Sequence, residues 1–375
     1  MKISIISYDL GNNCLGRAYL LGKVLRRKYD VEIHGFSFTN TEDPIWKPCD
    51  TGEFNYHSIA EKKFPSFFKS MAEMAKRLDG DVIYASKLRL PSYGVSLLKK
   101  VFGNKPVVLD IDDLETSWYQ HLKGSRRWRT IWDPTGPYPT QWMEHCVRFA
   151  DEVTTVSTQL QHKYGRGIII PHGKDTESFD PDKYDRIPMR KELGIKDFKT
   201  IMFLGTARPH KGLDDIVKAL NLLDRDDIRL MVIGAGADNK YDQSLKELGG
   251  EKIILRDGIP FNAIPEYLNA ADLVVLPQKN DMQSYGQIPA KLFDAMAMAK
   301  PIIATNVADL ALILEGCGLI VEPGDIASLA EKINWVFSHP MEAAAMGRDA
   351  RKKCIDEYSW DIMEKKLVTI FEKYE

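Results

Sequence analysis

Short apolar runs rich in β-branched residues recur along the first half of the chain, with longer amphipathic stretches between them. The runs are Ile3 to Ser7, Val31 to Phe36, Val82 to Ala85, Val107 to Leu109, Val153 to Val156 and Ile168 to Ile170. This alternation is typical of βαβ units, which place parallel strands in one sheet. The first half is therefore predicted to form an α/β domain with a parallel sheet.

The same pattern restarts after residue 200. Its runs are Ile201 to Leu204, Leu230 to Ile233, Ile253 to Leu255, Leu273 to Leu276, Ile302 to Ala304 and Leu319 to Val321. Two Rossmann-like α/β domains in tandem are thus expected, at residues 1–178 and 190–359. The stretch His172 to Met189 between them is rich in Pro, Gly, Asp and Lys, as an exposed hinge would be.

The end of the chain, residues 360–375, has apolar residues at helical spacing and no strand after it. We expect a helix there that packs on either domain. A length of 375 residues is ample for two domains, each with its own core.

Composition narrows the class of protein. A formal net charge of -2 with 44% hydrophobic residues argues against disorder and against bulk nucleic-acid binding. No apolar run approaches the roughly 20 residues that span a bilayer, and the first apolar run starts at the N-terminus without a signal peptide. A cytoplasmic location is therefore expected.

In open parallel sheets, ligands bind beyond the carboxyl ends of the strands. Gly205 to Gly212, which read GTARPHKG, directly follow an apolar run. The small residues allow the backbone to approach a ligand, and Arg208 and Lys211 offer positive charge to a diphosphate. The alternative is a turn with two solvated cations.

A second motif covers Ser284 to Ala297, where Pro289 suits the first position of a helix. Backbone amides from Gln287 to Ala290 are expected to hold a phosphate, with Lys291 adding charge and Asp294 accepting hydrogen bonds from sugar hydroxyls. The alternative is that Asp294 only stabilises the start of the helix.

Acidic residues crowd the end of another run, in Leu109 to Glu115. Clustered carboxylates suit Mg²⁺ or Mn²⁺, and they equally suit a general base or a group that orients a hydroxyl. Helix capping by Asp112 or Asp113 is the third interpretation. All three stay open at this stage.

Two weaker features complete the candidates. The turn Gly11 to Gly16 follows the first run without GxGxxG spacing, so Gly11, Asn12, Asn13 and Gly16 are read as a loop that approaches the bound ligand. The turn Gly234 to Gly236 is read as structural.

A basic, aromatic zone extends from Ala60 to Lys100, with nine Lys or Arg against four Asp or Glu. Phe64, Phe67, Phe68 and Met71 lie among these charges, and Arg126, Arg127, Trp128, Arg129 and Trp132 repeat the combination further on. A basic amphipathic helix is typical of membrane-surface binding. The alternative explains either segment equally well: the charged residues form a solvated helix face, and the aromatic residues on the opposite face belong to an ordinary hydrophobic core.

Together these motifs resemble glycosyltransferase family 4, retaining glycosyltransferases of the GT-B fold, over nearly the whole chain. The resemblance rests on Gly205 to Gly212, on Gly286 to Ile303 and on the segments Ala270 to Pro277 and Gly316 to Ala330. It implies a cleft between two Rossmann-like domains, a reaction that retains the anomeric configuration, and no metal or other cofactor.

Carried over to this sequence, the resemblance places Lys211 at the donor diphosphate and Asp294 at the ribose. Gly205 and Thr206 are counted among the donor-binding residues. The base pocket would be lined by Gly258, Ile259 and Pro260. The remaining donor-binding residues would be Gly286, Gln287, Ile288 and Lys291. In the first domain it makes Gly11 to Gly16 the acceptor-side loop. A C-terminal helix that crosses back to the first domain is also implied.

Three positions depart from the family pattern. Thr206 stands where relatives usually have arginine, so Arg208 is the substitute that we expect. Gly286 stands where the first glutamate of the usual pair would be, and Gln283 or Gln287 is the neighbour that would replace its contact. Asp112 stands where many relatives have a histidine.

The expected function is transfer of a hexose from a nucleoside diphosphate sugar to a hydroxyl of a glycan or lipid-linked acceptor, as in glycan biosynthesis. Arg208, Lys211, Lys291 and the helix amides would stabilise the departing diphosphate, and Asp112 would orient the sugar or the acceptor. Peripheral contact with the inner face of the membrane is a further expectation. The alternatives are a sugar-nucleotide epimerase and an inactive nucleotide-sugar-binding protein.

Overall fold

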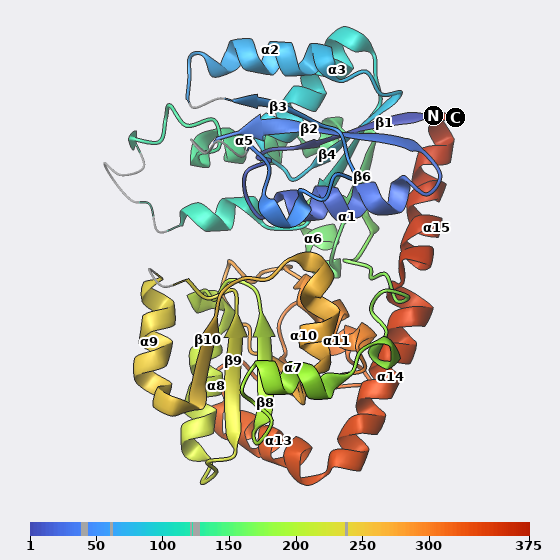
Figure 1. Ribbon diagram of the computed structural model, residues 1–375. Coiled ribbons are helices and arrows are strands. Elements are labelled where there is room, and N and C mark those ends of the chain that lie inside the picture. Colours follow the sequence, from blue (N-terminus) through green and yellow to red (C-terminus); the bar gives the residue numbers. More distant parts are fainter. Residues whose placement is uncertain (39–43, 61–62, 121, 123–127, 237–238) are drawn as a thin grey trace. The chain divides into compact units, whose positions relative to one another are not determined.

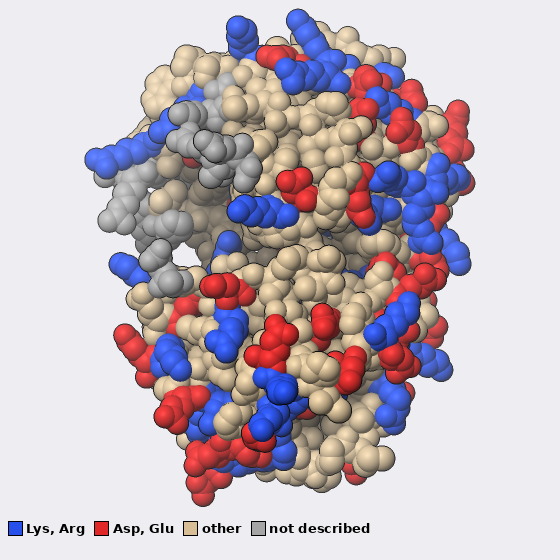
Figure 2. Space-filling model, viewed as in Figure 1, with Lys and Arg blue, Asp and Glu red and all other residues tan. Residues whose placement is uncertain are grey.

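The computed structural model describes residues 1–38, 44–60, 63–120, 122, 128–236 and 239–375. The chain divides into two compact units. Unit 1 comprises residues 1–172 together with 363–375, and unit 2 comprises residues 173–362. Acidic and basic side chains are intermixed over the face of the molecule that Figure 2 shows.

The described residues of unit 1 form one parallel sheet of seven strands in the order β3-β2-β1-β4-β5-β6-β7. The strands are β1 (Lys2–Ser7), β2 (Asp30–Ser37), β3 (Tyr56–Ala60), β4 (Val82–Ser86), β5 (Val107–Ile111), β6 (Glu152–Thr155) and β7 (Ile168–Ile169). Six of them were predicted from the apolar runs, and β3 was missed. The residues of β4 and β5 are buried throughout, as expected for strands covered on both faces.

Helices cover both faces of this sheet, with α2 and α3 on one face and α1 on the other (Figure 1). The helices of unit 1 are α1 (Leu15–Leu25), α2 (Phe67–Arg77), α3 (Val95–Gly103), α5 (Pro137–Cys146), α6 (Thr158–Tyr164) and most of α15 (Trp360–Phe371). Arg126 and Arg127, which we singled out as part of a basic, aromatic segment, lie outside the described residues.

The last helix belongs to unit 1 although it follows unit 2 in the chain. Met363, Leu367 and Ile370 are buried, and the ring of Phe371 meets that of Tyr84 edge-on at 5.3 Å. Ion pairs join this helix and the turn that follows it to the rest of unit 1, among them Arg27–Glu364 at 3.1 Å, Lys28–Glu372 at 2.6 Å and Lys373–Glu152 at 2.6 Å.

The described residues of unit 2 form a parallel sheet of six strands in the order β10-β9-β8-β11-β12-β13. The strands are β8 (Lys199–Leu204), β9 (Ile228–Ile233), β10 (Ile253–Arg256), β11 (Leu273–Leu276), β12 (Ile302–Thr305) and β13 (Leu319–Val321). Each coincides with a predicted apolar run to within two residues.

The helices of unit 2 are α7 (Arg186–Glu192), α8 (Leu213–Leu222), α9 (Lys240–Gly249), α10 (Ile264–Asn269), α11 (Ala290–Ala297), α12 (Leu310–Ile313), α13 (Ile326–Ser338) and α14 (Pro340–Tyr358). One core cluster joins Ile216 of α8, Leu245 of α9 and Ile333 of α13 to the strands. On the described part of the chain, no helix has the length and hydropathy needed to cross a membrane.

Candidate functional site

Three glycine turns follow neighbouring strands of unit 2 and lie against one another. Gly205, after β8, has a φ of +113° that favours glycine. A Cβ on Gly234, after β9, would lie 2.9 Å from the carbonyl carbon of Gly205, and a Cβ on Gly258, after β10, would lie 3.9 Å from the Cα of Gly234. The turn at Gly234, which we read as structural, is thus part of a continuous floor of backbone without side chains.

Lys291, in the first turn of α11, extends its ammonium group to this floor. A Cβ on Gly205 would lie 3.4 Å from the Nζ of Lys291, which itself lies 3.6 Å from the centre of the Phe203 ring. Among the described residues, this buried Nζ has no hydrogen-bond partner. Burial, followed by the nearby charge of Lys211, lowers the pKa of Lys291 well below its usual value.

Lys211 and Arg208 lie on the turn that follows Gly205. The ammonium of Lys211 donates a hydrogen bond to the Thr206 carbonyl at 2.7 Å and lies 5.8 Å from the centre of the Phe203 ring. The charge of Arg208 also contributes to the lowered pKa of Lys291. Three positive charges therefore gather over the glycine floor, an arrangement suited to a polyanion such as a diphosphate.

The turn geometry around these cations requires glycine at two further positions. Gly212, between Lys211 and α8, has a φ of +70°, and a Cβ there would lie 1.9 Å from the Pro277 carbonyl oxygen. Gly286, buried in the loop before α11, has a φ of +68°. The Gln287 amide already donates to the Ser284 carbonyl at 3.1 Å, and Ile288 is buried.

Asp294, one turn beyond Lys291, is buried and forms an ion pair with Lys174. Lys174 is held in place by the break between α14 and α15, since its amide donates to the Tyr358 carbonyl at 2.8 Å and its carbonyl accepts from Trp360 at 2.9 Å. Its ammonium also lies 4.1 Å from the centre of the Phe179 ring. Asp294 is therefore a fixed carboxylate, and Lys174 is a partner that we did not anticipate.

In unit 1, the loop after β1 is organised by Asp9, whose carboxylate accepts hydrogen bonds from the Gly11 amide at 2.9 Å and the Asn12 side chain at 2.6 Å. Asn13 is exposed. A Cβ on Gly16 would make an ordinary contact of 3.5 Å with Trp46. Gly16 thus leaves room without being sterically required.

Lys87 follows β4 and occupies the centre of the acidic cluster that follows β5. Its ammonium lies 2.6 Å from Asp112, 2.6 Å from Asp113 and 3.3 Å from Glu115. Its φ of +73° is an uncommon backbone conformation for a lysine. The ammonium sits where a cation bound by these three carboxylates would sit, which weakens the metal-site interpretation of the cluster.

Asp112 is the member of this cluster suited to proton chemistry. Burial raises the pKa of Asp112 to about 7. The charge of Lys87 acts to lower this pKa, and the charge of Asp113 acts to raise it. Three carboxylates lie around one ammonium, and only Glu115 has a second cation in Arg89, so ionisation of the buried Asp112 beside its acidic neighbours is disfavoured. Asp110 is different, because its carboxylate is fully engaged by Arg17 at 2.8 and 3.0 Å and by Thr154 at 2.8 Å.

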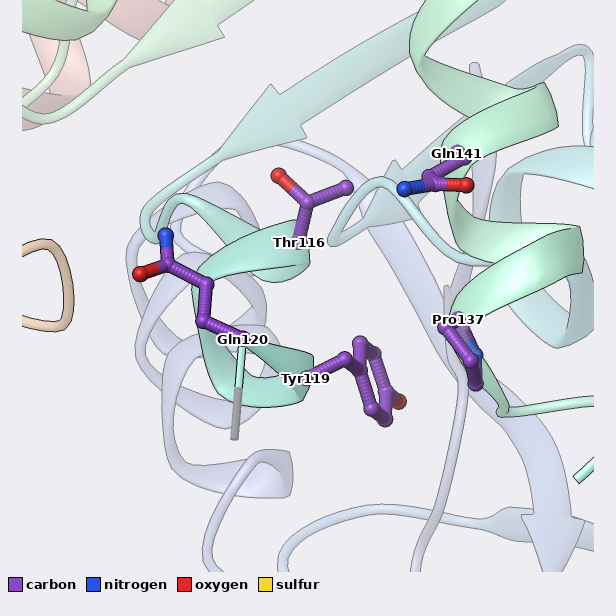
Figure 3. Close-up of a pocket in the computed structure, with 5 residues that line it drawn as sticks. All are labelled: Thr116, Tyr119, Gln120, Pro137 and Gln141. Carbon is purple, nitrogen blue, oxygen red and sulfur yellow. The ribbon is translucent and has the colours of Figure 1, made fainter. Parts of the chain in front are cut away.

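A surface pocket lies beside this cluster, lined by Thr116, Tyr119, Gln120, Pro137 and Gln141 (Figure 3). Arg89 links the pocket to the cluster, because its guanidinium donates to Glu115 at 2.7 Å and to the Tyr119 hydroxyl. Polar side chains and an aromatic ring together are a suitable lining for a sugar or another hydroxylated molecule.

Sequence reasoning did not identify Lys87, Arg89 or Lys174. For Lys87 a signal was present, because it comes directly after a predicted strand, where ligand-binding residues are expected. For Lys174 no such signal was present in the sequence, because its partner Asp294 is distant along the chain and the two residues meet only in the folded structure.

Comparison with protein families adds an independent finding. Residues 185–353, which make up most of unit 2, match the family described as glycosyl transferases group 1. The match contains the glycine turns, the basic turn and the loop that leads into α11.

Among curated proteins, the chain is 27% identical over 216 residues to a GDP-mannose-dependent monoacylated α-(1-6)-phosphatidylinositol monomannoside mannosyltransferase of Corynebacterium glutamicum, covering 54% of this chain. It is 26% identical over 232 residues, 56% of this chain, to the corresponding α-(1-6)-phosphatidylinositol monomannoside mannosyltransferase of Mycolicibacterium smegmatis. The chain spans 55% and 59% of the length of these two relatives.

Two solved structures share the architecture over the whole chain. HepE of Anabaena, determined with UDP and glucose, superposes with a TM-score of 0.79 at 15% identity and full coverage of both chains. Sucrose-phosphate synthase of Thermosynechococcus elongatus gives a TM-score of 0.76 at 19% identity, covering 100% of this chain and 98% of that one. The fold is therefore GT-B, as predicted.

Proposed function

We propose that this chain, which belongs to the group 1 glycosyl transferases, transfers a sugar from a nucleoside diphosphate donor to an acceptor hydroxyl. The observation that carries the proposal is the ammonium of Lys291, buried over a glycine floor and without a hydrogen-bond partner among the described residues. An unpaired buried cation is costly, and a bound diphosphate would supply the missing negative charge.

The other groups of unit 2 suit the same donor. The bare backbone at Gly205 and Gly234 lets a diphosphate approach closely, and Lys211 and Arg208 bring further charge to it. As the sugar leaves, negative charge grows on the diphosphate, so these cations stabilise the transition state more than the ground state. Asp294, positioned by Lys174, would accept hydrogen bonds from the ribose hydroxyls.

Unit 1 would receive the acceptor. Asp112 has a carboxyl group that titrates near neutral pH, as a residue that orients or deprotonates a hydroxyl should. The pocket of Thr116, Tyr119 and Gln141 offers polar groups to a glycan or to the head of a lipid-linked acceptor. Gly11, Asn12 and Gly16 belong to the neighbouring loop after β1 and would contribute backbone and amide groups.

A thermal-shift panel of UDP, GDP, ADP and CMP tests the donor assignment. A ligand that binds the native state raises its stability by mass action, so one nucleoside diphosphate should raise the melting temperature more than CMP does. GDP is the first choice, because curated relatives carry GDP-mannose dependence in their names, and UDP is the second, because HepE was solved with it.

The matching sugar nucleotide should then be consumed only with an acceptor present. Conversion of the donor alone into an epimer would support the epimerase instead, and binding without turnover would support an inactive binding protein. If no nucleoside diphosphate raises the melting temperature, the donor assignment is wrong. The anomeric configuration of the product, measured by NMR, tests the retention that the family resemblance implies.

A second proposal concerns attachment of unit 1 to the cytoplasmic face of an anionic membrane. Phe68 of α2 is 64% exposed, and its ring contacts that of Phe64 in a tilted arrangement with the ring centres 4.7 Å apart. The Phe64 amide donates a hydrogen bond to the Trp132 carbonyl at 3.0 Å. Two aromatic segments thus meet at one surface, which Lys63 and Lys69 flank with positive charge. Phe67 and Met71, which we grouped with these residues, are buried and belong to the core.

Flotation with anionic and neutral liposomes tests this attachment. Each basic residue near an anionic surface contributes about 1 kcal/mol, so binding should need anionic lipid and weaken with salt. Phe68→Ser should reduce it, whereas Leu222→Ser, at a side chain equally exposed on unit 2, should not. Absence of anionic-dependent flotation at low salt would remove the membrane proposal and leave the transferase proposal intact.

A further inference from the structure

Two histidines and a glutamate converge on the sheet of unit 1, in the body of strands β2 and β3. Glu32 and His34 are two apart on β2 and so face the same side of the sheet, and His57 of β3 pairs with His34 in the strand register. One donor atom from each of the three side chains lies within 4.8 Å of the other two. The cluster is separate from the loops that hold Lys87 and Asp112.

His34 is the reason to expect a ligand here. It is 1% exposed, and neither ring nitrogen has a hydrogen-bond partner among the described residues. Its ring stacks on that of His57 at 4.6 Å with 23° between the planes, so binding of one ion by both rings requires a rotation of one ring about its Cβ–Cγ bond. A buried imidazole normally finds a partner for at least one nitrogen.

Glu32 is oriented so that one of its carboxylate oxygens lies near both histidines. Its Oε1 pairs with the ammonium of Lys2 at 3.0 Å, and Lys2 is itself held by Asp79 at 2.8 Å. The other oxygen, Oε2, lies 3.5 Å from the Nε2 of His34 and 3.6 Å from the Nε2 of His57. Ligand atoms bound to Zn²⁺ at about 2.1 Å in a tetrahedron are roughly 3.4 Å apart, close to both separations.

We propose that Glu32, His34 and His57 form a binding site for one divalent transition-metal ion of the Zn²⁺ type. Two imidazoles and one carboxylate suit Zn²⁺ or Co²⁺, whereas Mg²⁺ and Ca²⁺ prefer oxygen ligands alone. The side chain of His57 is 42% exposed, which gives the ion a route of entry and room for water as a fourth ligand. Lys2 repels the ion, and Asp79 offsets that charge while keeping Glu32 in place.

The bound ion would act structurally. β3 is the edge strand of the sheet, and its residues are only partly buried, so it has little apolar packing of its own. An ion shared by β2 and β3 would fasten this edge to the rest of unit 1. The site requires nothing of the sugar-transfer chemistry and is independent of the proposed function.

The test uses the full-length chain, freed of metal with a chelator. Zn²⁺ is titrated by calorimetry, and Co²⁺ by its visible absorption, which reports imidazole ligands in a tetrahedral site. We expect one ion per chain and a melting temperature that rises with the ion. His57→Gln should weaken binding by at least about tenfold, while His145→Gln, which removes an exposed histidine of α5, should leave it unchanged.

Glu32→Gln gives a second measurement that leaves both imidazoles in place, and circular dichroism checks that each variant is folded. Loss of affinity in both variants supports the site. The proposal is overturned if the wild-type chain binds no ion, or if His57→Gln and Glu32→Gln bind it as tightly as the wild type does. In that case Glu32 is only a charged neighbour of the two histidines.

Discussion

Lys87 of unit 1 and Lys291 of unit 2 both have a buried ammonium group beyond the carboxyl ends of parallel strands, and the charges around the two groups are opposite. Lys87 is surrounded by Asp112, Asp113 and Glu115, and these carboxylates overcome the effect of burial and hold its pKa well above its usual value. Lys291 lies near Lys211 and Arg208, and burial with these charges holds its pKa well below.

The two lysines therefore show two roles for a buried charge, one in holding the protein's own side chains in place and one in binding a ligand. The cluster around Lys87 is complete within the protein, so it fixes the position of Asp112 before any ligand arrives. The cluster around Lys291 has an excess of positive charge, because the one acidic group among the described residues that acts on Lys291, Asp294, is itself paired with Lys174. On the proposed function, an anionic ligand would balance this charge. A buried ammonium group without a hydrogen-bond partner is therefore a stronger indication of a binding site than a glycine-containing turn alone.

The largest expected effect is on stability, through Lys87→Met. Removing the ammonium takes away a cation that contacts the buried Asp112 and Glu115 and the partly buried Asp113, and only Glu115 keeps the Arg89 ion pair, so the free energy of unfolding should fall by about 3 to 5 kcal/mol at neutral pH. Urea unfolding of this variant and of the exposed-pair control Lys218→Met measures the effect. A loss no larger than that of the control would mean that the cluster is not closed as described.

Lys291→Met should weaken the binding of the nucleoside diphosphate strongly, and it should not lower the free energy of unfolding as Lys87→Met does. Loss of a charged hydrogen-bond donor, worth about 1.5 to 3 kcal/mol, should weaken the nucleoside diphosphate roughly 10- to 150-fold in a calorimetric titration. Stability without ligand should stay equal or rise, because a desolvated cation is removed. Equal affinity for wild type and variant would show that Lys291 does not hold the donor.

The same lysine predicts a pH dependence. Its folded-state pKa lies below the usual 10.5, so between the two values the unfolded chain binds more protons. The wild type should therefore gain stability relative to Lys291→Met as pH rises toward 10.5. Parallel stability curves for the two proteins would contradict the lowered pKa.

Asp112→Asn tests whether the carboxylate of Asp112, in the cluster around Lys87, takes part in sugar transfer. The variant keeps the shape but loses the charge, and turnover should fall about tenfold through a weaker hydrogen bond to the acceptor or sugar. Because the pKa of Asp112 is about 7, wild-type turnover should decline as pH falls through that value, and the variant should not show this step. Full activity in Asp112→Asn would remove this residue from the site.

The smallest expected effect is that of Lys174→Met. Asp294 would lose the partner that positions it, and donor affinity should fall about fivefold, equivalent to about 1 kcal/mol. Asp294→Asn provides the comparison, because it removes the acceptor charge itself. If both variants bind nucleoside diphosphates like the wild type, neither residue contacts the donor side of the reaction.

Hydrophobic patterning was sufficient for most of the architecture, because strands buried on both faces read as continuous apolar runs. Leu273 to Leu276 and Ile201 to Leu204 are of this kind. The strand Tyr56–Ala60 is different, since it lies at the sheet edge with partly exposed residues and reads YHSIA. The missed strand carries His57, so the histidine cluster was missed with it.

The candidate site could be predicted where its residues are close in sequence. Gly205, Arg208 and Lys211 share one turn, and Lys291 and Asp294 share one helix. Contacts between distant segments, such as Lys87 with Asp112 or Arg17 with Asp110, depend on the order of strands in the sheet. Sequence spacing does not encode that order, so these pairs appear only in the folded chain.

The return of residues 363–375 to unit 1 has a consequence for how the protein is made. At translation rates of about 5 to 20 residues per second, residues 173–362 take roughly 10 to 40 seconds to synthesise. Throughout that interval the nascent first unit lacks Leu367 and Phe371, and the apolar surface around Tyr84 that they cover stays open to chaperones. Completion of unit 1 is thus delayed until residues 363–375 leave the ribosome.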